Sequence, residues 1–447
     1  FAWHGSGGHS AFLPFYFTPW IVILYRRAID DVRWSAAVAA LMALTLFEGG
    51  VYPFPFFSLL LIYETLVGWI RPGKRWETLR AALVTAPLIL LMGAFRLAPI
   101  LDTMSRYPRP TKGADAITML EILDMLTAQA HARKFGHQFV WDEYGTYVGW
   151  IGVALFLVGV LWMIWARRWA LTGATFLFGS LVLGHGSDFH PWALLHHLPV
   201  FDSLRVPSRF AVLATFFLAI GATGAMETAR RSFAQHRRRR SGRIAYGLLM
   251  AGLWFGLAVL VMDVMETHKP QMRRWNYAAL PALAQGEPYH FVSDSRYYQY
   301  ASFPARNVSN RRCYSGMNYT SARGLWVGKG NQVRFRPRRG GKLEAFDRTT
   351  NTITAKVTLR KDATLIFNQT YAHGWTASKG TLVPDRHRRM TVTLPKGTHT
   401  VVLTYWPPRF LPAALGSALG LLLALLVALF GRGRRPPKAV APPETSP

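Results

Sequence analysis

The sequence predicts a polytopic α-helical membrane protein with about nine transmembrane helices. A small extracytoplasmic domain of antiparallel strands, of the β-sandwich type, is expected before the last helix. Apolar stretches of roughly 15 to 20 residues recur almost without charge, basic runs follow every second stretch, and one late segment alternates at period two. With 51% hydrophobic and 14% aromatic residues among 447, the chain is more apolar than an ordinary soluble protein.

The apolar stretches are matched in length to a bilayer core. Because cytoplasmic loops are enriched in Lys and Arg, the basic runs predict which side each loop faces. This pattern predicts Phe1 outside and Pro447 in the cytoplasm. The expected spans are 9–25, 34–48, 52–70, 80–100, 146–166, 169–184, 207–227, 244–264 and 411–430.

The same pattern predicts the domain organisation. Residues 1–264 form the multispan domain, and 410–430 the final transmembrane helix. The chain begins at Phe1 without a methionine or a basic n-region, so further spans are expected upstream. The other segments are a mixed extracytoplasmic lead-in (265–341), the β-sandwich (342–409) and a disordered basic cytoplasmic tail (431–447).

A net charge of +29 suggests nucleic-acid binding in a soluble protein. Here many of the cations lie in short runs between spans, where orientation and anionic lipid account for them. We therefore expect membrane lipid and no nucleic acid as a partner. The single cysteine, Cys313, excludes an intrachain disulfide framework and a multi-cysteine metal site.

Short alternating stretches predict the strands of the late domain. They are "NTITAKVTL", "TLIFNQT", "RMTVTLP" and "HTVVLTYW", separated by turn signals such as Lys-Gly. Trp375, in "YAHGWTA", is a candidate for stacking on a sugar ring. The alternative is that Trp375 belongs to the core of the sandwich.

Arg205 and Arg209 lie in "LPVFDSLRVPSRF", which the topology places outside, just before a span that begins near Pro207. If this turn is helical, their i, i+4 spacing directs both guanidiniums to one face beside the positive end of the helix. Such a pair suits a lipid phosphate, because guanidinium forks match phosphate oxygens. The alternatives are snorkelling to lipid headgroups or a salt bridge to Asp202.

This phrase resembles a recurrent phrase of bacterial polytopic proteins related to the GT-C glycosyltransferase superfamily. The ending, "NQTYAHGWTASKG" followed by "LPKGTHTVVLTYWPPRF", is similar to the close of YfhO-like membrane proteins. The resemblance covers roughly Ser10 to Phe430.

The resemblance implies a multispan scaffold in the bacterial plasma membrane that transfers a sugar from a polyprenyl-phosphate donor to an envelope polymer or lipid acceptor. GT-C enzymes carry their catalytic carboxylate in the first long outer loop, so that residue is expected upstream of this sequence. No cofactor is firmly predicted; a divalent metal is one possible holder of the leaving phosphate. The alternative is a non-enzymatic assembly or transporter-like protein on the same scaffold.

Further polar residues are expected near the outer face. Arg96 is a third candidate phosphate ligand, with pairing to Asp102 as its alternative. Glu48 ends a span and is a candidate for lining a cavity, although solvation of the helix end explains it as well. Asp102, Asp202 and His185 are further cavity candidates. The histidine-rich stretch 185–197 matches no metal-ligand motif, so no metal site is assigned.

Overall fold

The protein is described from a computed structural model. The chain divides into two compact units, each considered by itself. The helical unit comprises Phe1–Arg96, Thr111–Trp275 and Leu415–Pro447, and the sheet unit comprises Leu97–Pro110 and Asn276–Ala414. Almost half of the predicted lead-in, and the predicted tail after residue 431, lie outside the described residues. The described residues are 10–50, 52–107, 116–129, 145–186, 190–235, 240–273, 288–293, 303, 307–311 and 322–431.

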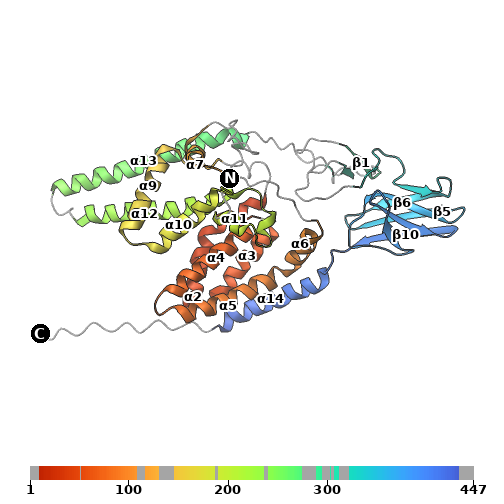
Figure 1. Ribbon diagram of the computed structural model, residues 1–447, viewed down its shortest axis with the longest axis horizontal. Helices are drawn as coiled ribbons and strands as arrows, with labels where there is room; N and C mark the ends of the chain where they lie inside the picture. Colours follow the sequence, from red (N-terminus) through yellow and green to blue (C-terminus); the bar gives the residue numbers. More distant parts are fainter. Residues whose placement is uncertain are drawn as a thin grey trace. The chain divides into compact units, whose positions relative to one another are not determined.

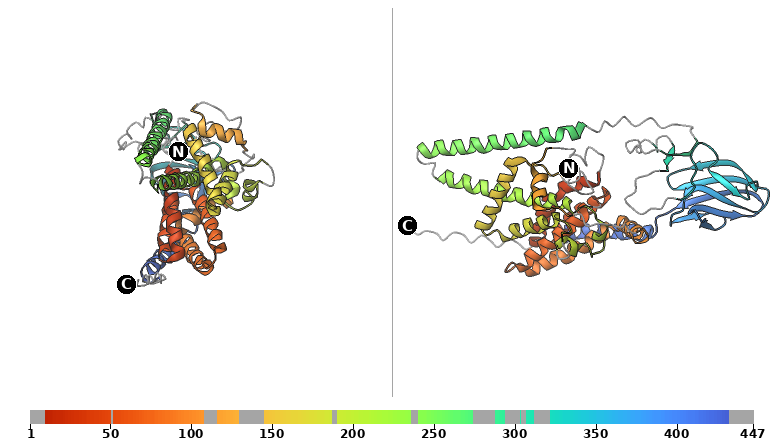
Figure 2. Two further views of the ribbon diagram at one scale, coloured as in Figure 1. Left: turned by 90° about the vertical axis from the view of Figure 1, so that its left-hand side faces the viewer. Right: turned by 45° about the horizontal axis from the view of Figure 1, so that its top comes forward.

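Helices make up the described part of the helical unit (Figures 1 and 2). Proline near the first turn favours the start of α2, α4 and α11, because its fixed φ suits a helix and it needs no hydrogen-bond acceptor there. The α-helices are α2 (Thr18–Asp30), α3 (Trp34–Phe47), α4 (Pro53–Ile70), α5 (Arg75–Met92), α6 (Ala94–Arg106, shared with the sheet unit), α7 (Met119–Thr127), α9 (Gly149–Trp165), α10 (Trp169–Val182), α11 (Pro191–Leu195), α12 (Ala211–Gln235), α13 (Arg240–Arg273) and α14 (Phe410–Phe430).

Within the described residues, four helical segments are long and apolar enough to cross a membrane: Pro53–Ile70, Pro207–Gln235, Ile244–Pro270 and Phe410–Phe430. A fifth arises if α5 and α6 are counted as one bent span. Helices α3, α9 and α10 are apolar but shorter. The length and composition of these helices thus support the expected membrane character of the chain, while the count of nine spans stays a prediction.

Two of the expected spans have a different local structure. The stretch 9–25 contains a 3-10 helix, η1 (Ser10–Phe17), and only then α2. The stretch 80–100 breaks at Gly93, where α5 and α6 meet at 73°. Hydropathy averages over such breaks, so the sequence alone predicts one continuous span in each place.

Helix α14 stabilises the break between α5 and α6. The Ser417 hydroxyl accepts a hydrogen bond from the N–H of Phe95 and donates one to the carbonyl of Leu91, each at 3.0 Å. Two backbone groups that the interrupted helix leaves open therefore gain partners. Gly420 permits this close approach, since a Cβ there would lie 2.6 Å from the backbone nitrogen of Met92.

The sheet unit contains two four-stranded antiparallel sheets, with strand orders β4-β5-β10-β7 and β3-β6-β9-β8. We call residues 333–405 the two-sheet domain. A separate parallel pair joins β1 (His290–Val292) to β2 (Val308–Asn310). The strands of the two sheets are β3 (Val333–Arg336), β4 (Gly341–Arg348), β5 (Thr352–Leu359), β6 (Ala363–Thr370), β7 (Trp375–Ala377), β8 (Leu382–Pro384), β9 (Arg389–Leu394) and β10 (Gly397–Tyr405).

Alternation along the strands builds one hydrophobic core from both sheets. In β5 the buried residues Ile353, Ala355, Val357 and Leu359 alternate with more exposed ones. They join inward side chains of β3, β6, β9 and β10 in a single cluster. The four predicted strands correspond to β5, β6, β9 and β10, and the expectation of antiparallel pairing is confirmed.

Candidate functional site at the start of α12

The segment that carries the two arginines enters α12 through a single 3-10 turn, η3 (Pro207–Phe210). Arg209 lies in this turn, whereas Arg205 precedes it, outside any helix or strand. The sequence analysis expected i, i+4 spacing to place both guanidiniums on one helix face. Because Arg205 lies outside the helical turn, they do not share such a face. The difference arises because Pro207 occupies the first turn, and a residue before proline is disfavoured from helical geometry.

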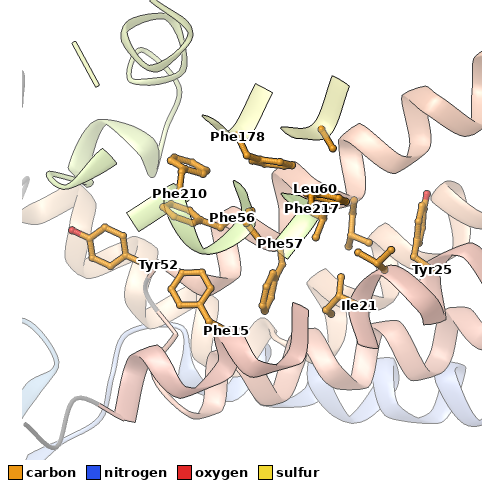
Figure 3. Close-up of a cluster of buried hydrophobic side chains, with 14 of the residues drawn as sticks. Phe15, Ile21, Tyr25, Tyr52, Phe56, Phe57, Leu60, Phe178, Phe210 and Phe217 are labelled. Atoms are coloured by element: carbon orange, nitrogen blue, oxygen red, sulfur yellow. The ribbon is translucent and has the colours of Figure 1, made fainter. Parts of the chain in front are cut away.

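Phe210 anchors the start of α12 in the core of the helical unit. Its ring is fully buried and stacks on Phe56 of α4, with 3.7 Å between centroids and 6° between planes. Phe178 of α10 and Trp192 of α11 contact the same ring (Figure 3 shows Phe56, Phe178 and Phe210 together). Because close-packed aromatic side chains have few alternative positions, the backbone that carries Arg205 and Arg209 is held in place.

Arg209 is stacked on aromatic rings. Its guanidinium carbon lies 4.0 Å from the ring centroid of Tyr52 and 4.7 Å from that of Phe12. The Tyr52 hydroxyl also accepts a long 3.5 Å hydrogen bond from the backbone N–H of Arg205. Cation–π contacts of this kind fix the plane of a guanidinium and do not neutralise its positive charge.

The groups between and around the arginines are buried. The Nε atoms of Arg205 and Arg209 are inaccessible to solvent. Ser208 is 2% exposed, and its hydroxyl finds no hydrogen-bond partner in the described part of the chain. A buried hydroxyl without a partner is costly, so an additional polar group beside it would be stabilising.

An open apolar groove of about 430 Å³ begins one helical turn beyond Arg209. Val212, Phe216 and Ala219 line it from α12. At spacings of three and four residues, these side chains lie on one face of α12, and Arg209 precedes the first of them by three residues, in η3. The opposite wall includes Phe15 and Tyr16 of η1, together with Phe156 of α9. The cation of Arg209 therefore precedes the apolar lining by about one turn of the chain.

The histidines of the neighbouring loop contact the backbone. Nδ1 of His190 lies 3.1 Å from the carbonyl of Gly184, and Nε2 of His196 lies 3.1 Å from the carbonyl of Leu204. His185 is half-buried, and Asp188 lies outside the described residues. Among the residues that the structure describes, no group of three His, Cys, Asp or Glu is placed to hold a metal ion.

The remaining polar candidates do not all gather at this site. Glu48 lies in the turn after α3 and is exposed, as are Arg96 at the start of α6 and Asp202 in η2 (Phe201–Ser203). Asp102 pairs with Arg106, one turn further along α6, at 2.9 Å. The alternative that Asp102 serves as the partner of Arg96 is therefore replaced by an ordinary i, i+4 ion pair.

Trp375 lies in β7 and packs partly buried against the core of the two-sheet domain. Its ring centroid is 5.4 Å from that of Tyr405. Burial raises the pKa of Tyr405, and the negative charge of Asp102 raises it further. Asp102 and Trp375, separate in the sequence, thus both lie near Tyr405 in the sheet unit. The packing favours the core role of Trp375 over sugar stacking.

A polar cluster that the sequence analysis missed joins α13 to the loop before α9. The hydroxyl of Tyr147 donates a 2.7 Å hydrogen bond to Asp263, and the side-chain amide of Gln129 donates to the same carboxylate at 3.1 Å. The signal was present, since Asp263 is an acidic residue within a predicted span.

A second missed pair lies in α2 and α4. Arg26 donates two 2.8 Å hydrogen bonds to Glu64, which is 3% exposed. A buried carboxylate in an apolar helix requires such a partner. Glu64 also lay inside a predicted span, so the same search for ionisable residues identifies it.

No protein-family model, curated protein or solved structure matches this chain.

Proposed function

We propose that the protein is a multispan protein of the bacterial plasma membrane that binds a polyprenyl-phosphate-linked sugar donor at Arg205 and Arg209. On this proposal it transfers the sugar to an envelope polymer or lipid acceptor, as the resemblance to GT-C glycosyltransferases implies. The full proposal has nine spans and an extracytoplasmic two-sheet domain folded as a β-sandwich. Four helical segments of spanning length support the membrane part.

The observation that carries this proposal is the arrangement of Arg209 and the groove. The stacked guanidinium of Arg209 supplies a fixed cation, and the groove beyond it has the apolar lining that a hydrocarbon chain requires. A phosphate attached to a long isoprenoid chain matches both parts. A soluble anion has no hydrocarbon chain and would leave the apolar groove unfilled.

A non-enzymatic role on the same scaffold is the second candidate. Its support is that the cation and the apolar groove are sufficient to bind a lipid phosphate, while the carboxylate that sugar transfer requires is expected upstream of this sequence. Binding of the lipid phosphate is common to both candidates, while sugar transfer belongs to the first alone.

Binding of polyprenyl phosphate to the purified chain in neutral-lipid nanodiscs tests the proposal. Arg205→Ala and Arg209→Ala should each lose on the order of 2 to 4 kcal/mol, about thirtyfold to a thousandfold in affinity. Arg209→Lys should recover only part of this, because lysine lacks the planar fork. Arg106→Ala is a matched control, since Arg106 is engaged with Asp102. Variants that fold normally and all bind within about twofold of the parent would show that the arginines only snorkel.

A further inference from the structure

The two-sheet domain and its flanks carry far more positive charge than the topology explains. Residues 322–409 hold seventeen Lys and Arg but only four Asp and Glu, a net charge of +13 out of +29 for the whole chain. The positive-inside bias governs short loops beside membrane spans and does not apply to a folded domain of this length. The charge of this domain therefore needs a different explanation.

Five of these seventeen cations lie at one end of the domain, where three strand connections meet. The N–H of Arg360, after β5, donates to the carbonyl of Gly340, before β4, at 2.8 Å. The N–H of Lys396, before β10, donates to Oδ1 of Asp362, before β6, at 2.9 Å. We call the five cations of these connections the cationic end: Arg338, Arg339, Arg360, Lys361 and Lys396.

The cationic end is exposed and poorly neutralised. All five side chains are exposed, and none takes part in an ion pair among the residues that the structure describes. Elsewhere in the domain Lys342 pairs with Glu344 and Arg389 with Asp385. Like charges held close together destabilise a fold unless something outside it neutralises them. The arrangement thus has the properties of a binding surface for anions.

The position of the cationic end favours a polymer over lipid headgroups. Strand β10 runs for nine residues from Gly397, next to the cationic end, to Tyr405, shortly before α14 begins at Phe410. A strand of this length spans about 30 Å. The cationic end and the start of the membrane helix therefore lie at opposite ends of β10.

We propose that the cationic end binds a linear polyanion of the cell envelope, a polymer that carries an oxyanion at each repeat. Three of the five cations are arginines, whose forks bind phosphate or carboxylate oxygens in pairs. Three adjacent connections offer several exposed charges to an extended chain, and release of its condensed counterions supplies affinity. The inference rests on the proposed outward placement of the domain, but not on sugar transfer.

The test compares two triple variants of the full chain in neutral-lipid nanodiscs. Arg338→Gln/Arg339→Gln/Lys361→Gln removes three charges from the cationic end. Arg323→Gln/Lys356→Gln/Arg386→Gln removes three exposed charges from other parts of the domain and is the matched control. Binding is measured with two labelled probes, inorganic polyphosphate and alginate, at several salt concentrations. The two probes separate phosphate from carboxylate as the preferred oxyanion.

The cationic-end variant should bind at least about tenfold more weakly in about 100 mM salt. The slope of log affinity against log salt concentration should become shallower by about two, since each lost contact contributes roughly 0.7. The control should stay within about threefold of the parent. The variant Arg338→Lys/Arg339→Lys, which retains charge, should keep most of the affinity and show that the fold is intact.

Three results would overturn the inference: equal losses in both triple variants, no binding of either polymer by the parent, or tighter binding of double-stranded DNA or of phosphatidylglycerol vesicles than of both polymers. Because the assay contains no polyprenyl phosphate, its outcome is independent of the donor site at Arg205 and Arg209.

Discussion

The Asp263 cluster predicts a strong energetic coupling between α13 and the start of α9. Tyr147→Phe removes one hydrogen bond to a carboxylate, for which about 1.5 to 3 kcal/mol is expected. Asp263→Ala removes both bonds and should destabilise the chain more. Gly149 adds a geometric check, because its φ is +67° and a Cβ there would lie 2.6 Å from Oδ2 of Asp263.

Gly149→Ala should therefore cost more than the roughly 1 kcal/mol expected from backbone strain at a left-handed residue. In an Asp263→Ala background the clash with the carboxylate disappears, so the additional cost of Gly149→Ala should fall to the strain alone. The free energy of unfolding in mixed detergent micelles measures each variant, and amide exchange along α13 shows whether its end is released. Additive effects of the two substitutions, or unchanged exchange in Tyr147→Phe, would refute the coupling.

Three further predictions concern stability. Burial opposes ionisation of Asp385, but the hydrogen bonds from Arg389 and from the His387 N–H lower its pKa. Asp385→Asn should therefore reduce the thermal midpoint most at pH 7. The difference in midpoint between parent and variant should narrow below about pH 4, because the parent's carboxylate is then protonated. Ser417→Ala should cost about 1 kcal/mol per lost hydrogen bond at the α5–α6 break, measured by detergent unfolding. Asn368 is buried, and its side-chain amide donates hydrogen bonds to the carbonyl of Trp326 and to Gln332, so Asn368→Ala should lower the thermal midpoint.

Periodicity and hydropathy located the elements whose patterns are local. The start of α12 near Pro207 and the alternation in β5 are examples, since a proline at a first turn and a period of two are visible in a short window. The bend at Gly93 was missed because hydropathy averages over it, and because Ser417, which bonds the open backbone groups there, is more than 300 residues away in the sequence. Strands β7 and β8 are three residues each, too short for a period to show.

The candidate site was predictable in its residues but not in its geometry. The outward position assigned to Arg205 and Arg209 drew attention to them, yet the contacts of Arg209 with Phe12 and Tyr52 join separate elements and leave no sequence signal. Asp263 and the cationic end do leave a signal in the sequence. Asp263 is an acidic residue in a predicted span, and the net charge of residues 322–409 can be counted directly. Both signals were missed because the positive charge of the chain was explained by the positive-inside bias of the loops.

Photo-crosslinking tests the donor site most directly. A polyprenyl phosphate with a diazirine on its isoprenoid chain is bound to the chain in nanodiscs, and the labelled peptides are identified by mass spectrometry. The account predicts labelling of the groove walls near Tyr16 and Phe216, abolished by Arg209→Ala and absent with the corresponding uncharged prenol. Equal labelling by the prenol, or labelling confined to other helices, would contradict a phosphate site at Arg205 and Arg209.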